Sequence, residues 1–480
     1  TGSTSNLGVT YDSTNNKVVI VYRDVGNSNY GTGIVFTVGS SNNTDFIGIT
    51  DEAISSAASG SVIVQGGVIT NTGLIPLAPT GGTPVTVLAG AAFWRAITYD
   101  TNSNKIVVAM RDDNASNAGV AFVGTVSGNS ISFGSKVTFA AGASAYYAMC
   151  FDSSNNKVVI IYRDSNNSNY GTAIVGTVSG TSISFGSPAV FESGAIASVT
   201  CAFDSSNNKV VIAYEDDQGN HYGKAIVGTV SGTSISFGSG ITFFPSYSYG
   251  FQAVFDSNAN KVVIAFTDYY NFSPYLREGK AIVGTVSGTS ISFGSAVLFK
   301  TTNAGDMSIA FDSSSNKVVI AYGAASTPRD GNAIVGTVSG TSISFGTETI
   351  FQSNEVTYIA CAFDSSVSQV VISYQHNDNA NKGTAIVGTV SGTSISFGSS
   401  YVFDAGSTRY AASVFDPDAN KTITTYGETT DGGKAVVLSV SNDLTIGTDY
   451  FVQTDGTIST TSSTVPAGRA LSTTSMLLEG

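Results

Sequence analysis

Apolar and polar positions alternate along this chain in short blocks that recur through most of its length. Between Ser198 and Gly250, four apolar runs end in CAFD or read KVVIAY, AIVGTV and SISFGS, and clusters of Ser, Asn, Asp and Gly separate them. Short runs rich in Val, Ile, Tyr and Phe between such clusters are typical of β-strands. The linkers DSSNNK and VSGTS favour tight hairpins, so the block predicts four antiparallel strands.

The same block occurs eight times, which we number as repeats 1 to 8. The Asp that follows a Phe or Tyr marks each copy: Asp12, Asp100, Asp152, Asp204, Asp256, Asp312, Asp364 and Asp416. Five of the seven intervals are 52 residues, one is 56 and the first is 88. A fixed period near 50 residues is typical of propellers and repeat arrays.

An all-β, eight-bladed β-propeller is the expected fold. A four-stranded sheet cannot bury both of its faces alone, and a closed ring of such sheets buries the faces and protects the strand edges. The alternative is a β-solenoid, which would show shorter rungs of parallel strands without two hairpin turns per period. The expected domains are a propeller over residues 1–452 and a C-terminal β tail over residues 453–480.

The long first interval predicts a small β insertion in repeat 1. GTPVTVLAG around Pro84 matches GSPAVFESG around Pro188, which belongs to the fourth strand of repeat 3. The surplus of 36 residues therefore falls at about residues 41–79, between the third and fourth strands of repeat 1. A segment this short has too little core to be stable by itself.

The two faces of the predicted ring differ in how much they vary. AIVGTVSGTSISFGS is identical in the four copies that begin at Ala173, Ala225, Ala281 and Ala385, so the face with the third-to-fourth turns is nearly uniform. The loops after the second strand and the connections between blades differ from copy to copy, and antiparallel pairing places both on the opposite, variable face. We expect recognition on the variable face.

Aromatic residues and Arg mark the candidate partner-binding positions, because these types are enriched among interface anchors. The candidates are Tyr269, Tyr270, Phe272, Tyr275, Trp94, Arg95, Tyr247 and Tyr249. The alternative is that loops simply vary faster and that these rings cover the core between blades. The density of aromatics in the loop of repeat 5 favours exposure for the first four candidates.

Composition and charge narrow the choice of partner. The net charge is −13 and Lys and Arg form no stripe, so neither nucleic acid nor an anionic lipid surface is an expected partner. No apolar run is long enough to cross a bilayer, and the chain opens at Thr1 without a charged and apolar leader. We therefore expect a soluble protein without membrane insertion.

Little in the sequence indicates catalysis, a metal or a cofactor. Cys150, Cys201 and Cys361 are expected to be small core residues, and His221 and His376 are expected to be loop residues without metal-ligand spacing.

The repeated Asp residues are equivalent to one another, whereas catalytic carboxylates need two different environments. Asp416, Asp418 and Asn420 only faintly match a calcium loop. A sialidase-type or lyase-type propeller is the enzymatic alternative, but Arg23, Arg111 and Arg163 are each followed by an Asp that neutralises them.

The block from Phe151 to Ser187 resembles the repetitive propellers of tail fibres and related structural proteins of tailed bacteriophages. Residues 44–67 are similar to the first half of a short module in those proteins, and residues 449–480 are similar to its second half. The resemblance implies an extracellular structural role, in a virion fibre or a surface filament that contacts a receptor, a glycan or another copy of itself.

The two half-modules each lack a partner sheet, so we expect them to pair with each other, either within one chain or between chains. The candidate self-assembly residues are Phe46, Ile47, Ile49, Val62, Val64, Tyr450, Phe451, Leu477 and Leu478. The functional hypothesis is a non-enzymatic, self-assembling adhesion protein. The alternatives are a monomeric glycan-binding propeller and a glycan-active hydrolase or lyase.

Overall fold

The computed structural model divides the chain into two compact units, Leu77–Ser441 and a second unit formed by Thr1–Pro76 with Asn442–Gly480. It describes residues 78–441 except 271–275, 303, 325–328 and 429–431, and in the second unit it describes only the strands named below. Within residues 78–441 the side chains of residues 94, 270 and 276 also lie outside the description. The all-β prediction is confirmed, because the described helices are two single 3₁₀ turns, η1 (Asp113–Ala115) and η2 (Asn377–Asn379). None of the described helices has the length and apolarity to cross a membrane.

Repeats 2 to 8 each form one antiparallel sheet, which we call a blade. Repeats 2 to 4 comprise β9 (Ala92–Asp100), β10 (Lys105–Asp112), β11 (Ala118–Ser127), β12 (Ser130–Phe133), β13 (Val137–Asp152), β14 (Lys157–Asp164), β15 (Tyr170–Ser179), β16 (Ser182–Phe185), β17 (Ala189–Asp204), β18 (Lys209–Asp216), β19 (Tyr222–Ser231) and β20 (Ser234–Phe237). Repeats 5 and 6 comprise β21 (Ile241–Asp256), β22 (Lys261–Tyr270), β23 (Leu276–Ser287), β24 (Ser290–Phe293), β25 (Val297–Lys300), β26 (Ala304–Asp312), β27 (Lys317–Ala324), β28 (Gly331–Ser339), β29 (Ser342–Phe345) and β30 (Thr349–Gln352). Repeats 7 and 8 comprise β31 (Val356–Asp364), β32 (Gln369–His376), β33 (Lys382–Ser391), β34 (Ser394–Phe397), β35 (Tyr401–Ser407), β36 (Arg409–Asp416), β37 (Lys421–Glu428) and β38 (Gly432–Ser441).

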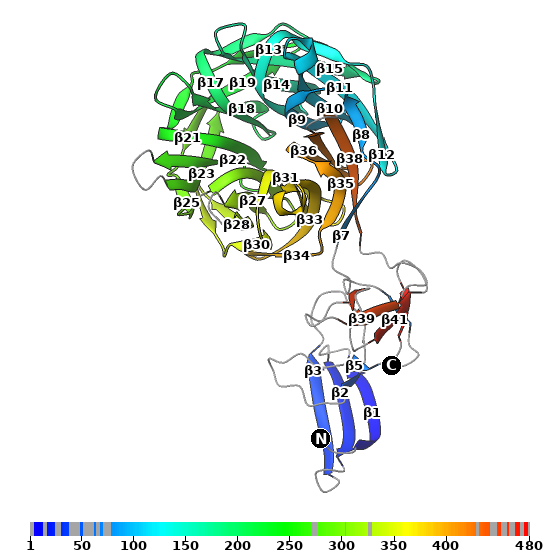
Figure 1. The fold of residues 1–480 in the computed structure, drawn as a ribbon. Coiled ribbons are helices and arrows are strands. Elements are labelled where there is room, and N and C mark those ends of the chain that lie inside the picture. Colours follow the sequence, from blue (N-terminus) through cyan, green and yellow to red (C-terminus); the bar gives the residue numbers. More distant parts are fainter. Residues whose placement is uncertain are drawn as a thin grey trace. The chain divides into compact units, whose positions relative to one another are not determined.

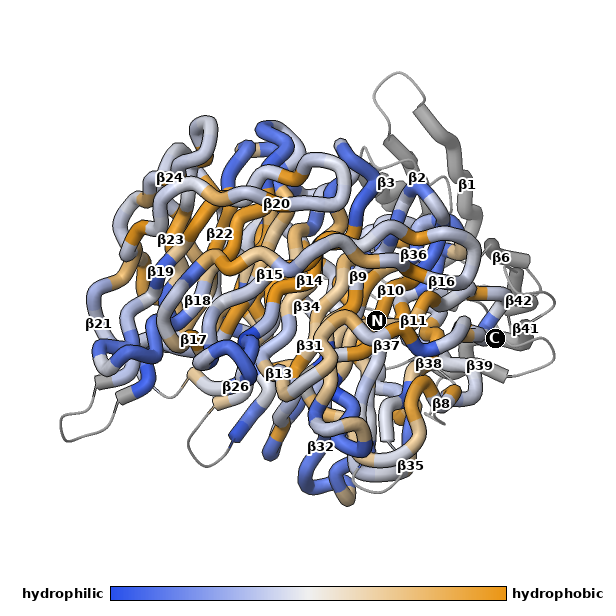
Figure 2. The backbone as a smooth tube through the Cα atoms, turned by 90° about the horizontal axis from the view of Figure 1, so that it is seen from above, coloured by the Kyte–Doolittle hydropathy of each residue, from blue (hydrophilic) through white to orange (hydrophobic). Residues whose placement is uncertain are grey.

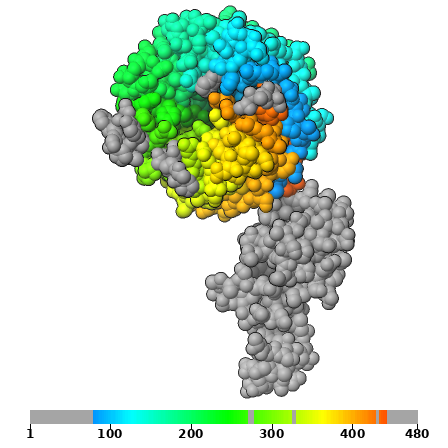
Figure 3. Space-filling view, in the orientation of Figure 1, coloured from blue at the N-terminus to red at the C-terminus, as the bar shows by residue number. Residues whose placement is uncertain are grey.

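The seven blades follow one another around a ring (Figure 1). The first strand of each blade contacts the first strand of the next, and β36 of repeat 8 contacts β9 of repeat 2. A long strand links some neighbours: the start of β13 pairs with β11 of repeat 2, and its end pairs with β14 of repeat 3. In Figure 3 the colours run in sequence around the ring, so that orange atoms of repeat 8 lie beside blue atoms of repeat 2.

The ring closes with a strand from its own beginning. β7 (Ala78–Gly81) and β8 (Val85–Leu88) pair with β38, with Leu438 opposite Gly81 and Ala435 opposite Val85. This segment is therefore the fourth strand of repeat 8, although the sequence assigned it to repeat 1. The eight-bladed arrangement is not confirmed for this reason, because the described strands of repeat 1, β1 to β3, form a separate three-stranded sheet. Most of the predicted insertion at residues 41–79 lies outside the described residues. The ring lies in the compact unit Leu77–Ser441, whereas the sequence predicted a propeller over residues 1–452.

The core lies between neighbouring blades, so the second strand of a blade is covered on both sides. Val210, Ile212 and Tyr214 of β18 pack toward repeat 3, while Val211 and Ala213 pack toward repeat 5. All five side chains are fully buried, which explains why KVVIAY is a continuous apolar run. Figure 2 shows the same hydrophobic band along the middle strands of the blades and hydrophilic residues at the turns.

The marker Asp of each repeat in the ring is a buried turn residue, as predicted. Asp204 is almost fully buried, and its Oδ1 accepts hydrogen bonds from the backbone N–H groups of Ser206 (2.9 Å) and Asn207 (3.1 Å). Asp416 accepts in the same way from Asp418 and Ala419, so this turn is built like the others. The cysteines Cys150, Cys201 and Cys361 are free and buried, which confirms their assignment to the core.

The uniform face owes its uniformity to close contacts between blades. A Cβ atom on Gly186 would lie 1.9 Å from the carbonyl oxygen of Thr233, which belongs to the third-to-fourth turn of the next blade. Gly134, Gly238, Gly294 and Gly346 have the same relation to the turn of the following repeat. Since only glycine permits this approach, a glycine follows the Phe of the fourth strand in each of these repeats.

The second unit consists of short sheets. β1 (Thr4–Asp12), β2 (Lys17–Asp24) and β3 (Tyr30–Thr37) of repeat 1 form one sheet, and β4 (Ile49–Thr50) pairs with β5 (Val62–Ile63). A third sheet has the order β40 (Ile458–Ser459), β39 (Asp449–Val452), β41 (Pro466–Ala470), β42 (Ser475–Leu478) and β6 (Val68–Thr70).

β42, in the second half-module, pairs with β6 of the same chain, and Met476 lies opposite Ile69. β6 directly follows the first half-module, residues 44–67, so contact between the two halves themselves stays a prediction. Of the candidate self-assembly residues, Leu477 takes part in this pairing, opposite Val68. Ile49 and Val62 lie in β4 and β5, Tyr450 and Phe451 lie in β39, and Leu478 pairs with Gly468 of β41. Phe46, Ile47 and Val64 lie outside the described residues. Pairing between chains stays a prediction.

Candidate functional site

A bulge in the first strand of the blades shapes the variable face of the ring. The residue six positions before the marker Asp has a positive φ in repeats 3, 4, 5, 7 and 8: Tyr146 (53°), Ser198 (42°), Gly250 (68°), Tyr358 (55°) and Tyr410 (51°). The pairing register with the second strand shifts at the same place, for example between Ala145 and Ala148. Bulges turn side chains away from the regular alternation and are frequent beside binding sites. Tyrosine in the left-handed region is uncommon and costs energy, which indicates a constraint beyond simple strand pairing.

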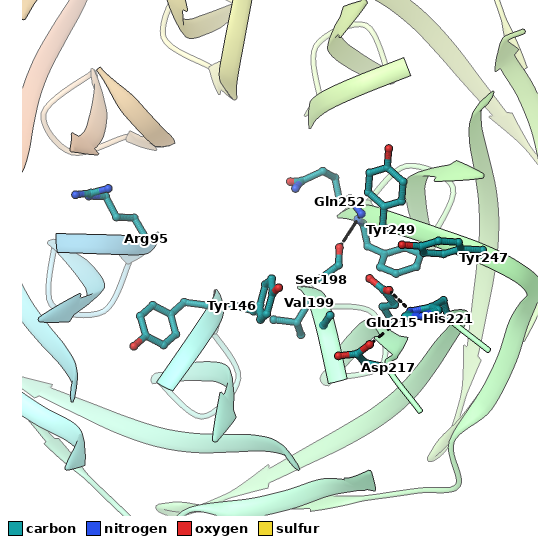
Figure 4. A pocket seen from close by; sticks show the side chains of 14 residues that line it. Arg95, Tyr146, Ser198, Val199, Glu215, Asp217, His221, Tyr247, Tyr249 and Gln252 are labelled. Atoms are coloured by element: carbon teal, nitrogen blue, oxygen red, sulfur yellow. Dashed lines mark hydrogen bonds and ion pairs between the residues drawn. The ribbon is translucent and has the colours of Figure 1, made fainter. Parts of the chain in front are cut away.

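A hollow of about 520 Å³ opens beside these bulges on the variable face, and we call it the mouth hollow (Figure 4). Its walls come from the first strands of repeats 2 to 5 and from the loop between β18 and β19. They comprise Arg95, Tyr146, Tyr147, Ala197, Ser198, Val199, Glu215, Asp217, His221, Tyr247, Tyr249, Gly250, Phe251 and Gln252. Four repeats therefore contribute to one concave site.

Glu215, Asp217 and His221 form a polar group on one wall. Glu215 is the penultimate residue of β18, and the following loop places Nδ1 of His221 2.7 Å from Oε1 of Glu215 and 3.5 Å from Oδ1 of Asp217. Burial raises the pKa of Glu215, and the hydrogen bond from His221 opposes this effect. His221 is a hydrogen-bonded loop residue, as expected. The expectation that it lacks metal-ligand spacing is wrong, because ligand atoms of Glu215, Asp217 and His221 lie within 4.8 Å of one another. Its position in the hollow was not predicted.

Three tyrosines form an aromatic cluster next to this polar group. The ring of Tyr247 lies 4.5 Å from that of His221, 6.2 Å from that of Tyr249 and 5.0 Å from that of Tyr269, measured between centroids. The guanidinium of Arg277 lies over the ring of Tyr269 at 5.8 Å. Burial raises the pKa of Tyr247 and of Tyr249. Both phenols therefore stay protonated at neutral pH and keep a hydrogen to donate.

Arg95 borders the hollow but is not the exposed anchor that the sequence suggested. Its side chain is 8% exposed, and Figure 4 shows the guanidinium turned away from His221. The guanidinium lies against Gly427 of repeat 8, where a Cβ atom would approach Nη2 to 2.3 Å. Nη2 donates to the carbonyl oxygen of Ala92, whereas Nε and Nη1 have no hydrogen-bond partner among the described residues. Burial lowers the pKa of Arg95 to about 10.

The structure brings together some of the predicted partner-binding residues. Tyr247 and Tyr249 line the hollow, and the ring of Tyr269 contacts both of them edge to face. The side chains of Trp94 and Tyr270, and the residues Phe272 and Tyr275, lie outside the described part of the chain. Binding by these residues stays a prediction.

Sequence reasoning missed Glu215, Asp217, His221 and Gln252. A signal for Glu215 and His221 was present in the sequence. Repeats 2 and 3 have Arg111 and Arg163 at the position of Glu215, and Asn117 and Asn169 at the position of His221.

Comparison with known proteins supplies no assignment. The sequence matches no protein-family model and no curated protein. Among solved structures, a protein of unknown function from Dyadobacter fermentans is similar at 11% identity and a TM-score of 0.47, over 76% of this chain and 99% of that one. A triple arginine-to-alanine mutant of AofleA from Arthrobotrys oligospora is similar at 10% identity and a TM-score of 0.41, over 60% of this chain and 82% of that one. With scores this low, the function has to be argued from the residues of the chain itself.

Proposed function

We propose that residues 77–441 form a seven-bladed β-propeller that binds a saccharide in the mouth hollow and does not catalyse a reaction. The observation that carries the proposal is the convergence of tyrosine rings with carboxylate and amide groups on one concave wall. A binding site of this kind combines apolar surface with a few directed polar groups. The role as a glycan-binding protein replaces a plain structural role as the first hypothesis.

The chemistry of the wall matches a sugar ring. A pyranose has a face of C–H groups that packs on aromatic rings, and a rim of hydroxyl groups that needs both acceptors and donors. Tyr247 and Tyr249 supply rings with an attached O–H group, and Glu215 and Asp217 supply acceptors. Gln252, from the neighbouring β21, offers an amide that both donates and accepts. These groups lie around one space, as a bound monosaccharide or disaccharide requires.

The arrangement of the carboxylates favours binding over hydrolysis. A glycosidase places its two carboxylates on either side of the scissile bond, with one as acid and the other as base or nucleophile. Glu215 and Asp217 are two residues apart on one turn, and both contact the same His221. They therefore contact a ligand from one side only, so they do not lie on opposite sides of a scissile bond.

An extracellular position fits this proposal, because glycans are presented on cell surfaces, and it agrees with the role that the phage-protein resemblance implies. Filament formation becomes the second hypothesis. It would need the tail of one chain to pair with the insertion of another, whereas β42 and β6 already pair within one chain.

Glycan-array binding tests the proposal. We expect the wild-type protein to retain a defined set of saccharides, and the double variant Tyr247→Ala with Tyr249→Ala to lose at least about tenfold in affinity, or about 1.4 kcal/mol. Tyr170→Ala is the matched control, because Tyr170 starts β15 but does not line the hollow. Circular dichroism should show the same folded ring in all three proteins. Absence of any retained saccharide, or equal retention by the double variant, would refute the proposal.

A further inference from the structure

We infer that Glu215, Asp217 and His221 hold a divalent cation of the Zn²⁺ class, whose free coordination positions face the mouth hollow and contact the ligand. The inference extends the proposed function and rests on it only for the identity of that ligand. Four observations carry it: the spacing of the donor atoms, the charge of the group, its comparison with the other repeats, and its opening toward the hollow.

The donor atoms already have the spacing of ligands around one ion. One oxygen from each carboxylate and a nitrogen of the imidazole lie within 4.8 Å of one another. The closest separations are 2.7 Å between His221 Nδ1 and Glu215 Oε1 and 3.5 Å between His221 Nδ1 and Asp217 Oδ1. Metal–ligand bonds of about 2.1 Å place neighbouring donors roughly 3 to 3.5 Å apart. Small side-chain rotations are therefore enough to bind an ion.

The group contains two carboxylates that form no ion pair with a Lys or Arg of the described residues. The side chain of Glu215 is 8% exposed, and its ion-pair partner among the described residues is His221. Asp217 has the same partner, and among residues 78–441 as described no Lys or Arg forms an ion pair with either carboxylate. The cluster contains two carboxyl groups and a single imidazole. A buried carboxylate is costly unless it is paired or bound to a metal.

The other repeats show what the fold needs at these positions when no ion is involved. In repeat 2 the same three positions hold Arg111, Asp113 and Asn117, and Arg111 forms a 2.6 Å ion pair with Asp113. Asn117 has φ near 60° and His221 has φ near 54°, so this position is left-handed in both loops and its backbone conformation does not itself require histidine. Repeat 4 differs from repeat 2 at two of the three positions. Together these two differences convert a neutral ion pair into a set of three metal ligands.

The ligand types indicate which cation fits. Imidazole nitrogen with two carboxylate oxygens suits Zn²⁺ or a similar transition metal, whereas Ca²⁺ and Mg²⁺ prefer oxygen donors alone. Three protein ligands leave at least one position open, and here the group lines a hollow of about 520 Å³. The ring of Tyr247, 4.5 Å from that of His221, restrains the imidazole on the side of the aromatic cluster. The open position is the place for a hydroxyl or carboxylate oxygen of the ligand.

Direct measurement of Zn²⁺ binding tests the site without any saccharide. Chelator-treated protein is titrated with ZnCl₂ by isothermal calorimetry, and metal content is measured after dialysis. We expect one high-affinity Zn²⁺ per chain, and a loss of about tenfold or more in affinity for His221→Asn, which restores the residue of repeat 2. Glu215→Gln should lose affinity to a similar degree. His376→Asn is the matched control, because His376 ends β32 in repeat 7 and lies outside the group, and its affinity should equal that of the wild type.

Saccharide retention is then compared before and after chelation. We expect chelation to weaken retention by the wild-type protein by about tenfold or more, and added Zn²⁺ to restore it. Absence of Zn²⁺ binding by the wild type, or equal binding by His221→Asn, overturns the cation site. Retention that is unchanged by chelation overturns the contact with the ligand. Failure of the proposed function has a different signature, since the wild type would then retain no saccharide with or without Zn²⁺.

Discussion

The carbonyl oxygen of Thr233 occupies the space that a side chain on Gly186 would need. The two residues belong to neighbouring blades, and an ideal Cβ on Gly186 would lie 1.9 Å from this oxygen. The carbonyl oxygen is part of the backbone, and a Cβ atom is bonded directly to the backbone. Neither atom can therefore move away by side-chain rotation. Replacement of this glycine must push the two blades apart.

Gly186→Ala should therefore lower the free energy of unfolding by about 2 kcal/mol or more, as overpacking does in a rigid interior. Urea unfolding followed by circular dichroism measures the change. Gly240→Ala is the control, since its nearest contact would be the Tyr214 hydroxyl at 3.4 Å and its stability should stay within about 0.5 kcal/mol of the wild type. Equal midpoints for both variants would show that the turns do not hold the blades in register.

Asp404 should make part of the ring's stability depend on pH. Burial of Asp404 opposes its ionisation, but hydrogen bonds from the Tyr426 hydroxyl, the Gly406 N–H and the Glu428 carboxyl, with the charge of Lys434, outweigh this effect, so its pKa lies below the ordinary value. The stability from Asp404 is fully present above the unfolded pKa of about 3.9 and is lost as pH falls through the folded pKa. Asp404→Asn should be less stable than the wild type at pH 7, and the gap should narrow below about pH 4.

Thermal unfolding between pH 7 and pH 3 measures this difference. Asp378→Asn is a suitable control, because Asp378 lies in the 3₁₀ turn η2, where no residue is buried. Parallel pH profiles for the wild type and Asp404→Asn would contradict the expectation.

Removal of the tail should expose the segment that it pairs with. Truncation after Gly456 deletes β42, the strand that lies against β6 at Val68–Thr70. An isolated short strand is not stable in water, so we expect proteinase K to cleave residues 41–79 faster in the truncated protein. The remainder of the ring, residues 80–441, should stay resistant in both proteins and serves as the internal control. Unchanged cleavage of residues 41–79 would mean that the pairing contributes nothing to their stability.

Size-exclusion chromatography of the same truncated protein separates the two modes of pairing. With pairing inside one chain, the elution volume should change only by the mass removed. Loss of a larger assembly on truncation would instead support pairing between chains and the filament hypothesis.

Local sequence pattern predicted the strands, the Asp turns and the distinction between the two faces. These features depend on residues that are close in the chain, such as Asp204 and the N–H groups of Ser206 and Asn207. The number of blades could not be predicted from local pattern, because it depends on which distant strand pairs with β8. The segment at Val85 fits the fourth strand of either repeat 1 or repeat 8, and only the pairing with Ala435 resolves it.

The site was less predictable than the fold for a similar reason. Arg95 is buried because Gly427 leaves room for its guanidinium, and these two residues are far apart in the sequence. Tyr247 and Tyr249 could be predicted from the sequence because they lie in an aromatic-rich run within one repeat. Glu215 and His221 became visible only through comparison with Arg111 and Asn117, since each of them is ordinary when taken alone.

The closing strand also explains how the second unit is assembled from two ends of the chain. Ala78 and Ser441 lie opposite each other in the pairing of β7 with β38, so the chain leaves the ring almost where it entered. Once folded, the ring therefore holds Ala78 and Ser441 close together, as a short connecting loop would. The entropy of closing a loop rises with its free length, and a folded ring removes most of that length. A different domain with adjacent termini should thus be exchangeable for the ring without separating β6 from β42.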